Sequence, residues 1–320
     1  MRYKPIIIVA GEPNSIFFEI FLKTIQKKRF KSPIILIGSK NLLNKKFKFL
    51  KSNITIADLD FKRKSQKKIQ FNKINLINVD YIQEKAFEKI SSKSNIYINN
   101  CFKIAISLLK KKVTDKLING PISKKHFLKN KFNGVTEYLA KKTKSKNFAM
   151  VIYNKSLSVS PLTTHIPIKY VTKKIKRSII IDKVMLIHFF WKKKFKFEPK
   201  IALTGLNPHC ESISRYNEDD QILKPSIKLL KKLKVNVDGP FSADTLFLKS
   251  NRKKFDVIVG MYHDQVLTPI KTLFEYNALN ITIGLPFIRV SPDHGPNESM
   301  IGKNISNPIS LEKSIKFLDY

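Results

Sequence analysis

The chain has 320 residues, of which 42% are hydrophobic, and carries a formal net charge of +37 from 61 Lys and Arg against 24 Asp and Glu. This length predicts about two globular domains, and no apolar run approaches the roughly 20 residues that a membrane-spanning helix needs. Two cysteines without a CxxC pair argue against a disulfide framework, so we expect a cytoplasmic protein with no membrane partner.

Short apolar runs alternate with longer amphipathic stretches along the chain. The short runs predict strands at 5–10, 33–38, 116–120, 148–153, 157–162, 200–206, 235–239, 256–261 and 279–286. The longer stretches predict helices at 14–29, 97–112, 136–144, 174–194, 217–233 and 308–318, whereas 58–75 predicts a loop or a weak helix. This alternation is typical of an α/β fold with a largely parallel sheet, in which ligands bind beyond the carboxyl ends of the strands.

The lysine excess is spread along the whole chain, in stretches such as KKIKRSIIIDK and WKKKFKFEPK. There is no arginine-rich arm and no glycine-aromatic RNA-binding signature. We therefore interpret the charge as a compositional bias and expect no nucleic-acid partner. A positive field of this size would still attract a phosphorylated substrate.

Three of the six histidines, His165, His209 and His263, each follow the end of a predicted strand. Three neutral imidazoles with an open fourth position are typical ligands of a catalytic zinc-type site, and this spacing is too wide for a structural zinc finger. Asp264, beside His263, and Asp244, in GPFSADT, are candidate carboxylates for orienting these ligands or a substrate.

A second group of polar residues surrounds the predicted strand 279–286. Lys271 precedes this strand, and Asn280 and Arg289 flank it. Two cations and an amide can hold a phosphate or a carboxylate, with arginine offering a planar fork. The glycines form neither GxGxxG nor GxxxxGK[ST], so a dinucleotide would have to bind without the usual Rossmann fingerprint or a P-loop.

Seven motifs occur in an order that resembles the 4-hydroxythreonine-4-phosphate dehydrogenase family. They are NGPISK (119–124), GVTEYLA (134–140), TTHIP (163–167), GLNPH (205–209), GPFSADTLF (239–247), MYHDQ (261–265) and NITIGLPFIRVSPDHG (280–295). The resemblance covers nearly the whole chain and is strongest over 116–302.

The resemblance implies a fold of two α/β/α domains, like the isocitrate and isopropylmalate dehydrogenases, with the active site in the interdomain cleft. We expect the first domain at 1–125 plus 290–320 and the second, with most metal and substrate residues, at 126–289. The family acts as a homodimer whose sites are shared between subunits, so a second copy of the chain is the expected partner.

The resemblance also implies the ligands and the residues that bind them. The family uses NAD or NADP and one divalent ion, such as zinc, magnesium or cobalt. Its metal ligands match His165, His209 and His263, and its substrate-binding positions match Val135, Thr136, Lys271, Asn280 and Arg289. We assign Asp244, Asp264 and Lys271 as candidate catalytic groups, and Asp293, His294 and Gly295 to the adenosine half of the cofactor.

The implied reaction belongs to pyridoxine and pyridoxal 5'-phosphate biosynthesis. The C3 alcohol of 4-phosphooxy-L-threonine, a small phosphorylated amino acid, is oxidised to 2-amino-3-oxo-4-phosphooxybutanoate, which loses carbon dioxide to give 3-amino-2-oxopropyl phosphate. A divalent ion would lower the pKa of the alcohol and polarise the ketone, while the nicotinamide carries the hydride.

Departures from the family pattern leave alternatives open. Val135 stands where the family has a histidine, and GEPNSIFFE replaces the usual GDPAGIGPE near the N-terminus. One alternative is a related dehydrogenase of another four-carbon phosphorylated hydroxy acid, a phosphothreonate or a phosphoerythronate. Another is a non-catalytic basic binding protein.

Overall fold

The computed structural model describes residues 3–27, 29–51, 54–60, 69–70, 73–128, 131–211, 216–275, 277–292 and 294–320. The chain forms two compact units, of which the first comprises 1–143 and 286–320 and the second 144–285. The limits expected from the sequence, 125/126 and 289/290, differ from these. Residues 126–143 and 286–289 therefore belong with the first unit.

The described strands of the first unit lie in the order β3-β4-β2-β1-β5-β12, and each pairs in parallel with its neighbour. Their bounds are β1 Ile6–Val9, β2 Ile34–Gly38, β3 Ile56–Asp58, β4 Ile74–Asn78, β5 Lys116–Asn119 and β12 Ile288–Ser291. All four residues of β1 are buried, as expected for a central strand covered on both faces.

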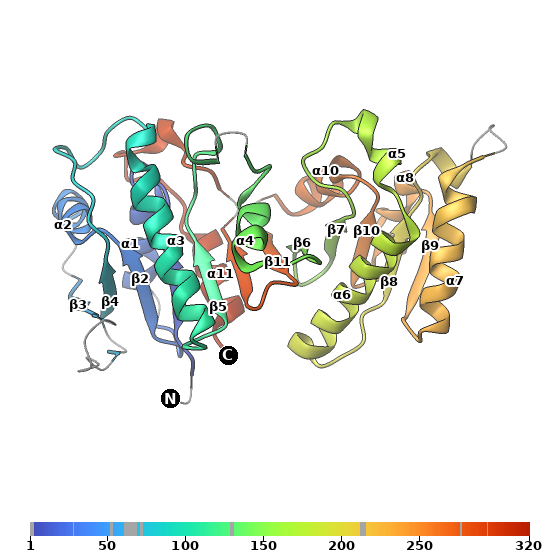
Figure 1. Ribbon diagram of the computed structural model, residues 1–320, viewed down its shortest axis with the longest axis horizontal. Coiled ribbons are helices and arrows are strands. Elements are labelled where there is room, and N and C mark those ends of the chain that lie inside the picture. Colours follow the sequence, from blue (N-terminus) through green and yellow to red (C-terminus); the bar gives the residue numbers. More distant parts are fainter. Residues whose placement is uncertain are drawn as a thin grey trace. The chain divides into compact units, whose positions relative to one another are not determined.

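Helices cover the strands of the first unit. Their bounds are α1 Phe17–Lys27, α2 Lys40–Phe49, α3 Asn95–Lys110, α4 Val135–Thr143 and α11 Ile309–Leu318, with short turns η1 Ser92–Ser94, η2 Lys124–Leu128 and η6 Glu298–Met300. Helix α3 packs on β1 and β2, and α11 packs on β5 and β12; Figure 1 shows α3 in front of these strands and α11 behind them.

The described strands of the second unit lie in the order β11-β6-β7-β10-β8-β9. Their bounds are β6 Ala149–Tyr153, β7 Ser158–Pro161, β8 Ile201–Thr204, β9 Val237–Phe241, β10 Val257–Gly260 and β11 Leu279–Ile283. Strand β6 is antiparallel to β11 and to β7, and the other pairs are parallel. The carboxyl ends of β7, β10 and β8 therefore meet at one edge.

The helices of the second unit are α5 Val171–Lys174, α6 Arg177–Phe195, α7 Lys224–Lys232, α8 Ala243–Leu246, α9 Lys249–Arg252 and α10 His263–Phe274, with turns η3 Ile168–Tyr170, η4 Pro208–Cys210 and η5 Asp219–Leu223. Helix α6 packs on β6 and β11, and α10 packs on β7 and β10. Val266 and Ile270 of α10 join Val159 and Ile258 of those strands in one apolar core.

The structure confirms the α/β class, the nine predicted strands and the six predicted helices (η5 and α7 together cover 217–233), with shifts of up to three residues at their ends. It adds elements that the sequence pattern did not reveal. Strands β3 and β4 fall at the borders of 58–75, which was predicted to be a loop or a weak helix. That prediction was wrong where the two strands overlap this range. Residues 61–68 and 71–72 lie outside the described residues. The residues taken as one strand, 279–286, end as β11 at Ile283, and Arg289 lies in a separate strand, β12.

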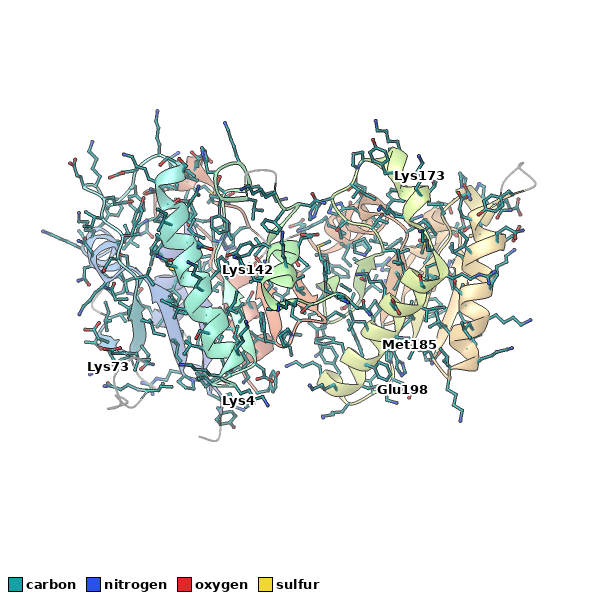
Figure 2. The ribbon with its side chains drawn as sticks, in the orientation of Figure 1. Lys4, Lys73, Lys142, Lys173, Met185 and Glu198 are labelled. Carbon is teal, nitrogen blue, oxygen red and sulfur yellow. The ribbon has the colours of Figure 1, made fainter. Side chains whose placement is uncertain are left out.

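Lysine side chains leave the molecule from many elements. Figure 2 labels Lys4 before β1, Lys73 before β4, Lys142 on α4 and Lys173 on α5. This spread accords with a compositional bias. Among the described residues, no helix is long and apolar enough to span a membrane.

One lysine, Lys46 of α2, is instead fully buried. Its Nζ donates to the Pro13 carbonyl at 2.7 Å and lies 4.2 Å from the ring centroid of Phe87. Burial lowers its pKa to about 7, against the attraction of the Glu12 carboxylate. Glu12 is fully buried as well, and desolvation raises its pKa, so both groups shift toward their neutral forms.

Candidate functional site

The three histidines follow the carboxyl ends of three neighbouring strands in the second unit. His165 comes four residues after β7, His209 five residues after β8, and His263 three residues after β10. Because these strands are parallel and adjacent, all three side chains belong to one edge. This is the edge at which α/β proteins bind ligands.

His165 and His263 are brought together, with ring centroids 5.5 Å apart. His263 is the first residue of α10, and its Nδ1 lies 2.6 Å from Asp264 Oδ1. A carboxylate on Nδ1 fixes the orientation of an imidazole and leaves Nε2 for a ligand. Asp264 is thus in contact with His263.

His209 lies in the loop between β8 and η5, in the left-handed region of backbone space. Its φ is 54°, and that of Cys210 is 60°, a conformation that non-glycine residues seldom adopt. Its Nδ1 lies 3.5 Å from Ser242 Oγ and 3.8 Å from Asp244 Oδ2. A hydrogen bond from Ser242 lowers the pKa of Asp244.

Within the described part of the chain, no three His, Cys, Asp or Glu side chains gather closely enough to hold a metal ion. The chain therefore brings His165 to His263, and His209 to Asp244, but it does not assemble the three histidines into one cluster.

Lys271 and Asn280 also lie in the second unit. Lys271 is in the last turn of α10, where burial lowers its pKa. Asn280 lies inside β11, and its Nδ2 approaches Met150 Sδ at 3.8 Å. Its Oδ1 is buried and has no hydrogen-bond partner among the residues that the structure describes, as would suit a group that meets a ligand.

A second polar group surrounds Arg289 in the first unit. The side chain is 3% exposed; its Nε donates to Asn119 Oδ1 at 2.7 Å and an NH group to Thr136 Oγ1 at 3.4 Å. Burial lowers the pKa of Arg289 to about 10, against the attraction of Glu137, so the guanidinium stays charged at neutral pH. Val135 begins α4, directly before Thr136.

Three loops at the carboxyl ends of β1, β5 and β12 meet in the first unit. The Glu12 amide donates to the Pro121 carbonyl at 2.8 Å, and the Ile16 amide to the Pro296 carbonyl at 3.2 Å. A Cβ on Gly11 would lie 2.4 Å from the same Pro121 oxygen. A side chain at Gly11 would therefore separate these loops.

The loop after β12 contains the residues assigned to the cofactor. His294 Nδ1 lies 3.1 Å from the Gly295 carbonyl, whereas its buried Nε2 has no hydrogen-bond partner among the described residues. A Cβ on Gly295 would meet only Asn297 Oδ1, at 3.8 Å, so the packing of the protein does not itself require glycine there. Asp293 lies outside the described residues.

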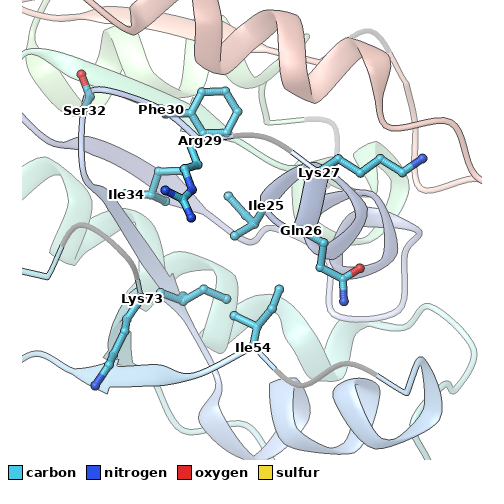
Figure 3. Close-up of a pocket in the computed structure, with 10 residues that line it drawn as sticks. Ile25, Gln26, Lys27, Arg29, Phe30, Ser32, Ile34, Ile54 and Lys73 are labelled. Carbon is cyan, nitrogen blue, oxygen red and sulfur yellow. The ribbon is translucent and has the colours of Figure 1, made fainter.

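The first unit has cavities at both edges of its strands. One of about 800 Å³ lies after the end of β4 and is lined by residues such as Tyr81 and Tyr97. Another, of about 490 Å³, lies at the amino ends of β2 and β4, between Arg29, Ile34 and Ile54 (Figure 3). The latter is on the edge opposite the loops described above.

The structure also reveals polar residues that the sequence analysis did not single out. Asn119, 1% exposed, holds Arg289. Asp219 and Gln265 bind the loop that carries His209. Their motifs, NGPISK and MYHDQ, and the acidic run NEDD were visible in the sequence, but their partners depend on the tertiary fold.

Comparisons with known proteins agree with this architecture. The family described as "Pyridoxal phosphate biosynthetic protein PdxA" matches residues 29–318. The 4-hydroxythreonine-4-phosphate dehydrogenase of Sulfurihydrogenibium sp. (strain YO3AOP1) is 40% identical over 97% of this chain and 95% of its own. The D-threonate 4-phosphate dehydrogenase of Salmonella typhimurium (strain LT2) is 29% identical over 99% and 98%.

A solved structure shares the fold over nearly its full length. The 4-hydroxythreonine-4-phosphate dehydrogenase of Klebsiella pneumoniae superposes with a TM-score of 0.84 at 26% identity, over 98% of each chain. This confirms the fold of the isocitrate and isopropylmalate dehydrogenases. The chain belongs to the PdxA family of pyridoxal phosphate biosynthetic proteins and is an oxidoreductase, not a non-catalytic basic binding protein.

Proposed function

We propose that this protein oxidises 4-phosphooxy-L-threonine with NAD or NADP and a divalent metal ion. The product, 2-amino-3-oxo-4-phosphooxybutanoate, then loses carbon dioxide to give 3-amino-2-oxopropyl phosphate for pyridoxal 5'-phosphate synthesis. The observation that carries the proposal is the pairing of His165 with His263, 5.5 Å apart at the carboxyl edge of the second unit, in a chain of this family.

The residues proposed to hold the metal are ligands that suit a divalent transition-metal ion such as zinc or cobalt better than magnesium, which prefers oxygen ligands. His165, His209 and His263 offer imidazole nitrogens, and a nearby carboxylate or hydroxyl faces Nδ1 of the last two. Bound there, the ion would supply Lewis-acid chemistry toward the C3 oxygen of the substrate. Asp264 and Asp244 would keep the His263 and His209 rings in one orientation.

The proposed anion-binding residues are Arg289, Lys271 and Asn280, together with Thr136. A buried guanidinium binds phosphate or carboxylate through charge-assisted hydrogen bonds that are roughly twice as strong as neutral ones. The Asn280 Oδ1, buried without a described partner, would accept a hydrogen bond from the substrate. The positive charge of the chain would speed the arrival of the anion.

NAD or NADP would accept the hydride from C3, and we assign its adenosine half to the loop after β12. The orphaned His294 Nε2 and the open space above Gly295 support this assignment. With Asp293, these residues would bind and orient the dinucleotide by side-chain and backbone contacts.

We further propose a homodimer in which His165 and His263 of one subunit join His209 of the other. A mixed dimer of one His209→Ala subunit and one His263→Ala subunit should then contain one intact site of two. In that site the His209→Ala subunit supplies His165 and His263, and the His263→Ala subunit supplies His209. Random mixing should restore about a quarter of the wild-type sites. The measurement is NAD(P)H formation after denaturation and refolding of the mixture.

The matched control is a mixture of His165→Ala and His263→Ala subunits. These two side chains lie together in one protomer, so every mixed site would lack one of them, and the mixture should stay inactive. Equal recovery in both mixtures, or a fully active monomer in sedimentation, would contradict the shared site.

A second candidate substrate is D-threonate 4-phosphate, which carries a hydroxyl where 4-phosphooxy-L-threonine has an amine. It is favoured by Val135, which can neither donate a hydrogen bond nor carry charge, and by the name of the Salmonella relative. Erythronate 4-phosphate is a further four-carbon analogue of this class. A hydrogen bond lost from a charged group costs about 1.5–3 kcal/mol when nothing replaces it.

We expect the metal-loaded enzyme to turn over 4-phosphooxy-L-threonine better than either analogue, with kcat/KM falling as salt screens the positive field. Val135→His should leave this activity similar or raise it. The measurement is NAD(P)H formation with each compound, with and without chelator. Undetectable turnover of the amino compound beside good turnover of a threonate or erythronate phosphate would replace the proposed substrate.

A further inference from the structure

We propose that Asp219 and Gln265 are positioning residues that hold the His209 loop, residues 205–210, in the conformation that binds metal. The proposal rests on the proposed function, because it takes His209 as a metal ligand. Nothing in the sequence motifs assigns either residue a role of this kind.

The His209 loop adopts a conformation that its own residues do not favour. His209 and Cys210 both have positive φ, 54° and 60°, and the His209 side chain is 72% exposed, so packing does not hold it. Left-handed residues of this kind persist when the surrounding structure fixes them, and they concentrate at functional sites. Something else must therefore fix the loop.

Asp219 holds the start of the loop by hydrogen bonds to its backbone. Its carboxylate is fully buried; Oδ1 accepts from the Leu206 amide at 2.8 Å, and Oδ2 accepts from the Asn207 amide at 3.0 Å and from Asn207 Nδ2 at 2.9 Å. A Cβ on Gly205 would lie 3.0 Å from this carboxylate. The loop therefore wraps one buried carboxyl group, which accepts from two of its backbone amides and from the side chain of Asn207.

Gln265 ties the same loop to the strand end that carries His263. Its Oε1 accepts from the Met261 amide and from Thr204 Oγ1, and its Nε2 donates to the Gly205 carbonyl, all at 2.7 Å. These partners lie at the ends of β10 and β8. The side-chain amide of Gln265 thus links the end of β8, where the His209 loop begins, to Met261 at the end of β10. Met261 is two residues before His263.

The test is Co²⁺ binding to the purified full-length dimer, measured by chelator competition and by the visible spectrum of the bound ion. Gln265→Met keeps the length of the side chain and removes all three hydrogen bonds. Asp219→Asn replaces one acceptor oxygen by a donor. We expect each variant to bind Co²⁺ about 10- to 100-fold more weakly, as when the partners of metal ligands are removed, with an altered spectrum.

Asn154→Ala is the matched control for stability. Asn154 is buried in the same unit, after β6, where its Nδ2 donates to the Asn277 carbonyl and its Oδ1 accepts from the Ser156 amide. Its loss should lower the melting temperature, as we also expect for the other two changes, but leave the Co²⁺ affinity and spectrum unaltered. A purely structural role of Asp219 and Gln265 would give the same result as this control.

The outcomes separate the two proposals. Wild-type Co²⁺ affinity in folded Gln265→Met and Asp219→Asn, with binding lost in His209→Ala, would overturn the positioning role and leave the metal site standing. Unchanged binding in His209→Ala would overturn the metal site itself. If Gln265→Met does not fold, Asp219→Asn decides the question alone.

Discussion

His263→Ala is expected to remove the bound divalent metal and to lower kcat/KM by more than about 100-fold, the upper end of the effect seen when only a partner of a metal ligand is lost. His263 is paired with His165 at 5.5 Å and oriented by Asp264 at 2.6 Å. Its replacement would leave the other imidazoles without a third ligand. His165→Ala and His209→Ala should behave in the same way.

Metal content after dialysis and NAD(P)H formation from 4-phosphooxy-L-threonine are the two measurements. His126→Ala is the control, because His126 lies in η2 of the first unit and is no candidate ligand; it should retain wild-type metal and activity. Stoichiometric metal in any one of the three ligand variants, His209→Ala included, would overturn the three-histidine site.

The strands of this fold could be predicted because most are short apolar runs. Strand β10, VIVG, is buried throughout, and the polar pair His263 and Asp264 follows three and four residues after its end. Strand β4, INLIN, was missed because it alternates with asparagine next to a Lys-rich stretch. Asn75 is nevertheless buried, since its Nδ2 donates to the Ile34 carbonyl at 3.0 Å.

Two of the missed helices, α10 and α2, were hidden for identifiable physical reasons. Helix α10 contains Pro269, which normally argues against a helix interior, but its buried Val266 and Ile270 anchor it on the sheet. Helix α2 is rich in lysine, and its polar surface hides the stripe formed by Leu42, Leu43 and Phe47. In both cases tertiary packing outweighs local propensity.

The candidate site was predictable only in its chemically distinctive members. Histidines placed after strands stand out in a sequence, and their placement at one edge follows from a parallel sheet. The positioning of Gln265 depends on β10 lying beside β8, although β9 separates them along the chain. The positive φ of His209 has only a weak signal in the residue type, because histidine, although enriched there among non-glycine residues, enters that region only occasionally.

Lys46→Met should change the pH dependence of stability. Burial lowers the pKa of Lys46 from 10.5 to about 7, so between these values the unfolded chain holds a proton that the folded chain has released. The contribution of Lys46 to the free energy of unfolding is therefore most favourable above pH 10.5. It becomes less favourable as the pH falls from 10.5 toward 7. In this window the free energy of unfolding of the wild type, minus that of the variant, should rise by about 1.4 kcal/mol per pH unit.

Urea unfolding of both proteins at pH 7.5, 8.5 and 9.5 measures this slope. Glu12 works in the opposite direction, since its raised pKa makes its contribution fall as the pH rises from 4.5. Subtracting the free energy of unfolding of the variant from that of the wild type removes the part of the Glu12 contribution that is the same in both proteins. Lys48→Met, on the exposed face of the same helix, is the matched control and should leave the slope unchanged, because the Lys48 ammonium group is in water in both states.

A flat difference for Lys46→Met would mean that Lys46 remains protonated, held by Glu12 and the Pro13 carbonyl. The same variant would then lose stability at every pH, since removing one partner of a buried ion pair costs about 3–5 kcal/mol.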